Sequence, residues 1–297
     1  MTHAMVMPVK PAAATVSRTA MAKPRDRRWP SGAAYAGFIR FMLPILALLI
    51  VWELAVRGGW IASNVFPSPS MIFARANALL FSTGPEQGML FQHIGASLYR
   101  AISAFALSVI IAIPMGFALG LMPAVYKWVS PILSVLLPLP AVAWTPILLV
   151  AFGQGDRTII TVCFLGAFFP VLYSTIQGVR SVGKQPVWVV QSMGGTRRHV
   201  LLNVLLPSCM PALISGLKLG MAHSWRTLVA AEMLAALSAG LGYMIFAARS
   251  YMDVSTMFVG IALLALIGMA IEYGVFGVLE QRTVRKWHGA SKVGGMQ

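Results

Sequence analysis

The chain has 297 residues, 58% of them hydrophobic and 10% charged, whereas a soluble domain carries about 25% charged residues. This composition excludes a soluble protein and indicates a membrane protein with several spans. The net charge of +15 is typical of cytoplasmic flanks that face anionic headgroups, so we expect membrane lipid around the chain and no nucleic-acid partner. Cys163 and Cys209 are too few for a disulfide scaffold or a metal site.

The N-terminal segment, residues 1–36, is basic and rich in proline and alanine. It predicts a disordered cytoplasmic tail and not a signal peptide, because the basic region is long and the apolar run after it has spanning length. That run, residues 38–56, is the first predicted span, with Glu53 near its far end. Ser70 follows a proline-containing turn and is placed to cap a peripheral helix over residues 71–81 on the outer face.

The second predicted span covers residues 97–121. It contains Gly116 and Gly120, a spacing that lets membrane helices approach closely but that is also common by chance. Pro123 and Lys127 mark a short loop after it.

The third predicted span, residues 129–152, contains three prolines. Pro138, Pro140 and Pro146 cannot all sit inside one regular helix, because each removes a backbone donor. Broken helices at membrane depth occur where protein or a watery pathway satisfies the backbone. Two interpretations stay open: the break lines a pathway, or it is a kink that serves packing.

Three more apolar runs have spanning length: residues 158–179, 210–237 and 254–279. The six spans define a transmembrane domain over residues 37–287, followed by a cytoplasmic tail, residues 288–297. Basic residues cluster in both tails and in the connection 180–209, so the positive-inside rule places all three in the cytoplasm. The expected fold class is an all-α membrane protein.

The stretch from Gly183 to Gly220 is too patterned for a slack loop. Pro186 fits the first turn of a short helix, and the Gly194-Gly195 pair ends it, because glycine adopts the left-handed conformation that a helix stop needs. Thr196 is placed to cap a second, basic helix that runs into the membrane. We expect two prolines to interrupt that helix: Pro207 and Pro211. Such a projection suits a site that a soluble partner grips.

This stretch resembles the cytoplasmic "Glu-Ala-Ala" loop of the permeases of binding-protein-dependent ABC transporters. The family pattern continues from Glu-Ala-Ala to a glycine, then to an apolar residue with Leu-Pro, and then to a second proline. Gly195 matches the glycine, Leu206 and Pro207 match the Leu-Pro, and Pro211 matches the second proline.

The acidic motif itself is absent, since Val189, Val190 and Gln191 stand in its place. This departure puts the family's acidic contact to the ATPase in doubt. Our hypothesis is that apolar contacts from Trp188, Val190 and Met193 substitute for it. The resemblance assigns the following residues to the ATPase-coupling loop: Pro186, Trp188, Val189, Val190, Gln191, Met193, Gly195, Thr196, Leu206, Pro207 and Pro211.

Shorter runs look like the subgroup of this family that handles nitrate, sulfonates or taurine: residues 143–146, 152–155, 168–170, 230–233 and 241–243. The resemblance covers roughly residues 65–287 and implies the type I importer permease fold with six transmembrane helices, in the bacterial cytoplasmic (inner) membrane. It implies a homodimer of the permease, ABC ATPase subunits and a periplasmic or lipid-anchored solute-binding protein. ATP and Mg²⁺ would be held by the ATPase, so no cofactor is expected on this chain. The implied solute is a small anion such as nitrate, a sulfonate or taurine.

Ionisable side chains inside spans are expensive, so each is a functional candidate. Two interpretations fit Arg226: it attracts an anionic solute in a pathway, or it pairs with an acid of another span and holds the bundle together. His223 shares its helix face, whereas Glu232 lies six residues further on and does not pair with it locally. The candidate pathway residues are Pro140, Trp144, Pro146, His223, Arg226 and Glu232.

The sequence contains no Gly-x4-Gly-Lys-Ser/Thr loop, no Gly-x-Ser-x-Gly motif and no metal-spaced histidines. We therefore expect no catalytic residues, no metal and no enzyme activity, with ATP hydrolysis in a separate subunit. The alternative is a proton-coupled secondary transporter that uses Glu232 and Glu272. It predicts two halves with matching broken spans, and no such repeat is evident. A membrane-embedded enzyme would need catalytic residues clustered at one membrane face.

Overall fold

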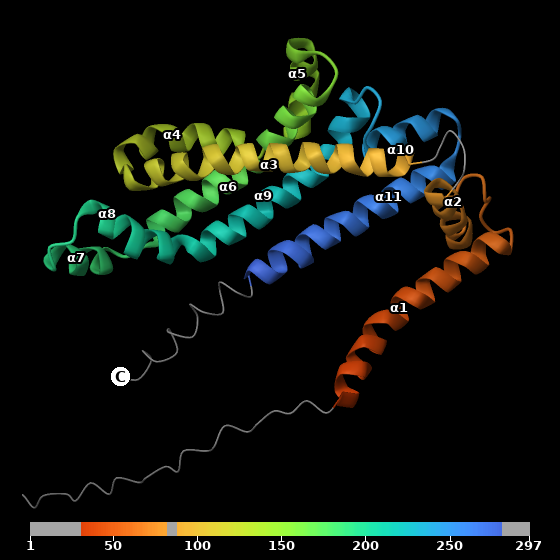
Figure 1. The fold of residues 1–297 in the computed structure, drawn as a ribbon, viewed down its shortest axis with the longest axis horizontal. Coiled ribbons are helices and arrows are strands. Elements are labelled where there is room, and N and C mark those ends of the chain that lie inside the picture. Colours follow the sequence, from red (N-terminus) through yellow and green to blue (C-terminus); the bar gives the residue numbers. More distant parts are fainter. Residues whose placement is uncertain (1–30, 82–87, 281–297) are drawn as a thin grey trace, which may run out of the picture. The chain divides into compact units, whose positions relative to one another are not determined.

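The computed structural model describes residues 31–81 and 88–280, without the side chains of residues 31–39 and 41. Within these residues the chain forms helices joined by short connections (Figure 1). One compact unit ends at Val51 and a second begins at Trp52, so helix α1 (Ser31–Arg57) belongs to both. Most of the predicted tail 1–36 and all of the predicted tail 288–297 lie outside the described residues.

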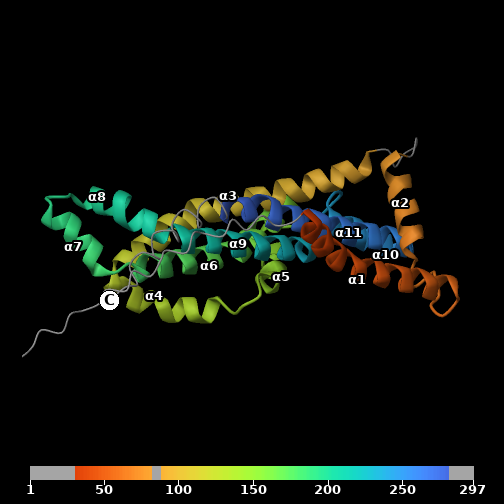
Figure 2. The same cartoon turned by 90° about the horizontal axis from the view of Figure 1, so that it is seen from below.

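The core of the second unit is a set of three long helices, α3 (Met89–Leu121), α6 (Asp156–Ser181) and α9 (Leu206–Ala235). Helix α6 packs along both α3 and α9 (Figures 1 and 2). Fully buried side chains from α6 and α9, among them Ile159 and Leu228, fill this core. These side chains bury the inner faces of the helices, so the outer faces stay exposed.

Glycines set the distance between these helices. A Cβ atom at Gly116 of α3 would lie 2.6 Å from the Thr175 Cβ atom of α6, and one at Gly120 would lie 2.7 Å from the Val179 Cβ atom. Helix α9 approaches α6 equally closely, because a side chain at Gly216 of α9 would overlap Ser174. Membrane helices associate largely through van der Waals packing, which such close approach increases. The glycine spacing noted in the sequence therefore marks real helix contacts.

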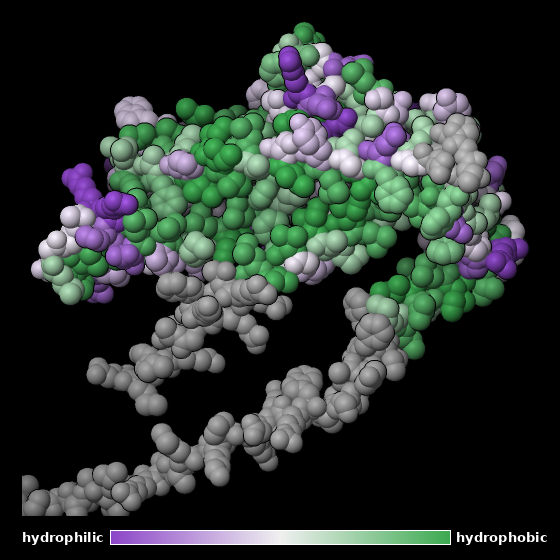
Figure 3. All heavy atoms as spheres, in the orientation of Figure 1, coloured by the Kyte–Doolittle hydropathy of each residue, from purple (hydrophilic) through white to green (hydrophobic). Residues whose placement is uncertain are grey.

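The other elements of the second unit are α2 (Pro69–Phe81), α4 (Pro123–Leu136), η1 (Ala141–Trp144), α5 (Thr145–Phe152), α7 (Lys184–Ser192), α8 (Arg197–Val200), η2 (Leu201–Leu205), α10 (Leu241–Ser250), α11 (Val254–Met269) and η3 (Ala270–Phe276). Among the described residues, four helices are long and apolar enough to cross a membrane: Met89–Leu121, Asp156–Ser181, Arg197–Ala235 and Val254–Glu280. Figure 3 shows apolar side chains over the long helices and hydrophilic ones at the end formed by α7 and α8. Exposed apolar residues such as Ile110 and Leu266 suit contact with lipid.

The third predicted span is two helices, Pro123–Leu136 and Ala141–Phe152, bent by 87° at the break between them. Pro138 and Pro140 lie in this break, as their missing N–H groups favour. Pro146 instead lies in the first turn of α5, where a proline loses no hydrogen bond. The expected loop at Pro123 and Lys127 is wrong, because both residues lie in α4 and Pro123 starts that helix.

The start of α2 also differs from the expectation. Helix α2 begins at Pro69, so its cap is Ser68, whose Oγ atom accepts the Met71 N–H at 3.4 Å. Ser70 does not cap the helix; its hydroxyl donates to Glu53 Oε1 at 2.7 Å. Glu53 in turn pairs with Arg57 at 2.6 Å. These contacts join the end of α1 to the start of α2.

Candidate functional site

Helices α7 and α8, with the turn between them, project from one end of the three-helix core (Figure 1). We call residues 184–200 the coupling projection. Gly194 in the turn has φ of +79°, in the left-handed region that favours glycine. The Gly195 N–H donates to the Val190 carbonyl oxygen at 2.9 Å. A Cβ atom at Gly195 would lie 2.7 Å from that same oxygen, so the turn closes only around a residue without a side chain.

The second helix of the coupling projection starts at a cap and runs into the core without a stop. The Thr196 N–H donates to Nδ1 of His199 at 3.3 Å, which satisfies a donor at the helix start. The helical segment then extends from Arg197 to Ala235. The prediction that Pro207 and Pro211 interrupt it is wrong. A π-helical turn, Leu201–Leu205, precedes Pro207, and such local adjustment re-satisfies the carbonyls that a proline frees.

The surface of the coupling projection combines apolar and basic side chains. Trp188, Val189 and Met193 are 59%, 58% and 83% exposed. Val190 is only partly exposed and lies against Gly195, so it supports the turn. Basic residues are exposed around the apolar group: Lys184, Arg197 and Arg198. Since the sequence has no Asp or Glu between Asp156 and Glu232, no acid balances them nearby in the chain.

A cavity of about 550 Å³ lies where the broken span meets α6 and α9. We call it the central cavity. Residues 137–142 of the break form one wall, and Leu219, His223, Arg226 and Thr227 of α9 form part of another. Three of the predicted pathway residues line it together: Pro140, His223 and Arg226. Trp144 and Pro146 lie further along the chain, in η1 and α5, and do not line it.

Arg226 has no carboxylate within ion-pair distance in the part of the chain that the structure describes. It also lines a smaller cavity of about 270 Å³, together with Lys218 and Glu272. Lys218 pairs with Glu280 at 3.5 Å. Of the two interpretations of Arg226, the ion pair with another span is not observed among these residues.

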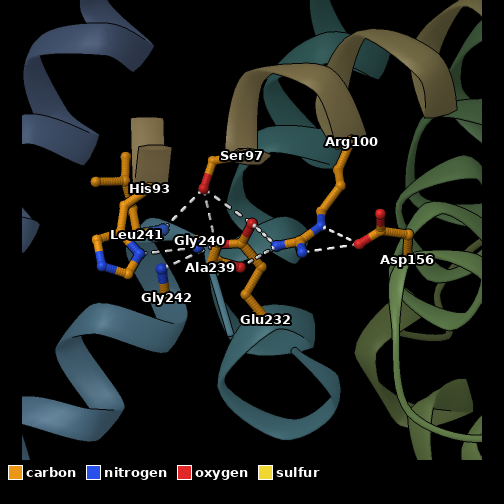
Figure 4. Close-up of polar contacts among 9 residues, drawn as sticks. All are labelled: His93, Ser97, Arg100, Asp156, Glu232, Ala239, Gly240, Leu241 and Gly242. Carbon is orange, nitrogen blue, oxygen red and sulfur yellow. Dashed lines mark hydrogen bonds and ion pairs between the residues drawn. The ribbon is translucent and has the colours of Figure 1, made fainter. Parts of the chain in front are cut away.

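The densest polar cluster joins α3, α6 and α9 around Arg100 (Figure 4). The Arg100 guanidinium lies 2.8 Å from Glu232 Oε1 and 2.7 Å from Asp156 Oδ1. Glu232 is fully buried and Arg100 is almost so. The Ser97 hydroxyl donates to the Glu232 carboxylate at 2.8 Å. We call this cluster the Arg100–Glu232 network.

The segment 239–242, which includes the first two residues of α10, closes the Arg100–Glu232 network (Figure 4). The Ala239 carbonyl oxygen accepts from Arg100 at 2.6 Å, and the Gly242 N–H donates to Glu232 Oε2 at 2.9 Å. The Gly240 N–H donates to Nδ1 of His93 at 3.1 Å. A Cβ atom at Gly240 would lie 2.6 Å from the Glu232 carboxyl carbon, so only glycine fits. Burying a charge is costly unless the charged group is paired and hydrogen-bonded, and both Arg100 and Glu232 are.

Glu232 was predicted as a pathway residue, but its partner Arg100 was not among the candidates. Arg100 falls at the start of the predicted span 97–121 and so toward the outer face, whereas α3 begins at Met89 and carries Arg100 inside the helix. A signal was available, since Arg100 and Glu232 are isolated charges of opposite sign in apolar surroundings, and such charges tend to pair. Glu232 therefore lies in a paired network and does not line the central cavity.

Comparison with known proteins decides the family. Residues 108–285 match the family described as the binding-protein-dependent transport system inner membrane component. The chain is 35% identical over 248 residues to the taurine transport system permease protein TauC of Escherichia coli, which covers 82% of this chain and 88% of TauC. The chain belongs to this family. It is the permease of an ABC importer, as the resemblance implied.

Other relatives of the permease carry related names. It is 29% identical over 264 residues to the putative aliphatic sulfonates transport permease protein SsuC of Bacillus subtilis, covering 89% of this chain and 92% of SsuC. It is 29% identical over 262 residues to the nitrate import permease protein NrtB of a Synechocystis species, covering 86% of this chain and 94% of NrtB. The predicted subgroup is thereby confirmed.

Among solved structures, an inward-facing conformation of the MetNI methionine ABC transporter matches the permease with a TM-score of 0.56 at 17% identity. The match covers 67% of this chain and 95% of that chain. At this identity the likeness concerns the fold alone. It confirms the expected all-α importer permease fold.

Proposed function

We propose that two copies of this permease form the membrane pathway of an ATP-driven importer for a small anion, such as nitrate, a sulfonate or taurine. In this proposal the chain crosses the bacterial inner membrane six times, with both termini in the cytoplasm. Separate ATPase subunits bind ATP and Mg²⁺, and a periplasmic or lipid-anchored protein delivers the solute. The names of the relatives support an anionic solute, as does Arg226, which has no ion-pair partner among the described residues.

The observation that carries the coupling part of the proposal is the single helical segment from Arg197 to Ala235. One end of it belongs to the coupling projection, and its far half lines the central cavity. A movement of the ATPase subunits that displaces the projection would therefore be carried along one rigid rod to the cavity. This gives two distant sites that bias one conformational equilibrium, which is what coupling requires.

The coupling-loop residues divide into two groups in this mechanism. Exposed side chains contact the ATPase: Pro186, Trp188, Val189, Gln191 and Met193. The others shape the projection and its rod: Val190, Gly195, Thr196, Leu206, Pro207 and Pro211. Our earlier hypothesis about apolar contacts is changed in one position, because Val189 and not Val190 presents its side chain outward.

The alternative of a proton-coupled transporter gains no support. It needs Glu232 as a relay group, yet that carboxylate is fully buried and held by Arg100, Ser97 and the Gly242 N–H. A carboxylate with three such partners is suited to joining helices. Glu272 alone would not form a relay chain.

Gentle detergent purification of the tagged permease from its native membrane tests the proposal. We expect an ATPase with a phosphate-binding loop to co-purify in roughly equal amount, and we expect the purified complex, supplied with its binding protein, to import its solute into liposomes only with ATP. Recovery of the permease alone, with uptake that follows a proton gradient, would contradict the proposal.

A further inference from the structure

We infer that the central cavity is an anion-binding site of the permease itself, which holds the oxoanion headgroup of a solute with a short aliphatic body during transport. This inference rests on the proposed function, because it assigns a solute-binding role to the importer's pathway. It goes further in placing chemical selection inside the membrane subunit, in addition to the solute-binding protein.

The central cavity lies half-way along the helices that form it. Its residues on α6 fall between Leu165 and Ser174, near the middle of Asp156–Ser181. Its residues on α9 fall between Leu219 and Thr227, well inside the segment Leu206–Ala235. Since both helices are apolar enough to cross a membrane, the cavity lies near the middle of a bilayer. At that depth a charged side chain is expensive and is found facing a cavity or a partner.

Arg226 is the one charged side chain among the lining residues of the central cavity. His223, three residues earlier on the same helix face, lines it too. No Asp or Glu is among its lining residues. Within the described residues, neither Arg226 nor His223 forms a hydrogen bond or an ion pair with the protein. A positive group held at mid-depth without a protein counter-ion is arranged to receive an anion.

Neutral hydrogen-bond donors surround the same space. Tyr173, Ser174 and Thr227 line the central cavity, and none of their hydroxyl groups is engaged by another described residue. Unengaged donors at this depth favour a ligand rich in acceptor oxygens.

The rest of the wall is apolar and indicates the shape of the ligand. Leu137, Leu139, Phe169 and Leu219 line the central cavity beside the polar groups. A bare oxoanion would leave most of a 550 Å³ space unfilled. A small organosulfonate satisfies both parts, because its oxygens match the planar fork of Arg226 and its carbon body contacts the leucines and the phenylalanine.

The test measures binding to the purified permease–ATPase complex without any solute-binding protein. Ligand-observed NMR titrations use three probes: ethanesulfonate, its neutral analogue ethyl methyl sulfone, and nitrate. We expect ethanesulfonate to bind, ethyl methyl sulfone not to bind, and nitrate to bind more weakly than ethanesulfonate. Arg226→Gln should weaken ethanesulfonate binding about tenfold or more, as the loss of a charge-assisted contact predicts. Arg226→Lys should recover part of the loss, because it keeps the charge without the fork.

Matched controls separate this effect from a folding defect. Arg157→Gln removes an exposed arginine of α6 that does not line the cavity, and it should bind ethanesulfonate as the wild type does. Each variant must co-purify with the ATPase in the wild-type ratio. If Arg226→Gln does not assemble, Thr227→Val, which removes one donor and keeps the volume, replaces it and should weaken binding several-fold.

The outcomes distinguish the inference from the proposed function. Wild-type affinity in an assembled Arg226→Gln complex, or equal binding of the sulfone and the sulfonate, overturns the inference and leaves the importer proposal intact. If nitrate binds in an Arg226-dependent way and ethanesulfonate does not bind, the part of the inference that gives the solute an aliphatic body is overturned. Absence of any co-purifying ATPase overturns the proposed function instead.

Discussion

At the scale of single residues, Gly195 decides whether the coupling projection can close. Its N–H donates to the Val190 carbonyl oxygen, and a Cβ atom at Gly195 would lie within 2.7 Å of that oxygen. The residue has no positive φ, so the demand is for space alone. A methyl group added there must push α7 away from α8.

We therefore expect Gly195→Ala to uncouple ATP hydrolysis from solute uptake. Hydrolysis by the assembled complex should persist, whereas uptake into liposomes should fall at least several-fold. The reason is that a displaced α7 can no longer transmit the movement of the ATPase to the segment Arg197–Ala235. Gly195→Pro should have a larger effect, since it also removes the N–H donor. Gly183→Ala is the matched control, as only Pro186 lies within 4 Å of its added atom. Normal uptake by Gly195→Ala would refute this role of the turn.

Arg100 and Glu232 form a buried ion pair, so the loss of either residue should destabilise the permease. Removing one partner of a buried ion pair costs about 3–5 kcal/mol, because the other charge stays buried without compensation. We expect Arg100→Met and Glu232→Gln each to lower the thermal unfolding midpoint of the detergent-solubilised permease. The double variant Arg100→Met, Glu232→Gln should be less destabilised than the sum of the single variants, and strict additivity would show that the two residues do not interact.

Asp253 gives a pH dependence outside the predicted spans. Burial raises the pKa of its carboxyl group, but hydrogen bonds from the Thr256 hydroxyl and N–H and the charge of Arg75 outweigh burial, so the pKa lies below its usual value. A lowered pKa in the folded state stabilises the protein above the unfolded-state pKa, about 3.9, and this stabilisation is lost as the pH falls through the folded-state pKa. We expect the unfolding midpoint of Asp253→Asn to lie below that of the wild type at pH 7 and to approach it in acid. A difference that grows on acidification would contradict the assignment.

At the scale of elements, the segment Arg197–Ala235 is, in the proposed mechanism, the rod between the coupling projection and the central cavity. Its one irregular turn, Leu201–Leu205, lies next to the projection. The rod transmits movement only if that turn stays helical. Leu201 and Leu202 have exposed side chains, so their backbone can be changed with little effect on the core.

We expect the double variant Leu201→Gly, Leu202→Gly to soften the rod. Each glycine in a helix costs about 1 kcal/mol relative to alanine, chiefly through backbone freedom. Uptake should fall while ATP hydrolysis and assembly are kept. The matched variant Leu201→Ala, Leu202→Ala removes the same side chains and should transport normally; equal defects in the two would attribute the loss to the side chains.

The elements also show what the sequence could predict. The spanning runs, the break at Pro138 and Pro140 and the turn at Gly194 and Gly195 follow from local chemistry, because each depends on a missing N–H or a missing Cβ atom. The uninterrupted helix through Pro207 does not follow, because a nearby π-helical turn absorbs the proline, and that adjustment depends on packing. The cap was predicted at Ser70 and not at Ser68, because Pro69 was assigned to the preceding turn, whereas it is the first residue of α2.

At the scale of the whole permease, the polar sites are made by residues far apart in the chain. The central cavity joins Pro140 to Arg226, and the Arg100–Glu232 network joins three helices and the segment 239–242. Residue types marked His223 and Arg226 as candidates, but sequence spacing alone cannot say which side of a helix meets a cavity. Long-range pairing of this kind needs the packed structure.

The interface with the ATPase also belongs to this scale. The coupling projection offers exposed apolar side chains and exposed basic ones, and the sequence has no acid between Asp156 and Glu232. We expect Trp188→Asp with Met193→Asp to reduce the ATPase that co-purifies with the permease about tenfold or more, because apolar anchors dominate interface energies. Gln185→Asp, an exposed change on the same helix outside the residues assigned to the ATPase contact, serves as the control for added charge. Unchanged co-purification of the double variant would move the interface elsewhere.

The glycine contacts between α3, α6 and α9 have a mechanical consequence. Gly116 and Gly120 fit against Thr175 and Val179, and Gly216 fits against Ser174, so α3 and α9 are each closely packed on α6 and sliding along it would bring side chains into collision. Any reshaping of the pathway must then leave the three helices as one body and take up its strain elsewhere. The exposed residues 137–140, where the third span breaks, offer the hinge: α4 and α5 can swing there relative to the three helices, which move together with the rod as one body.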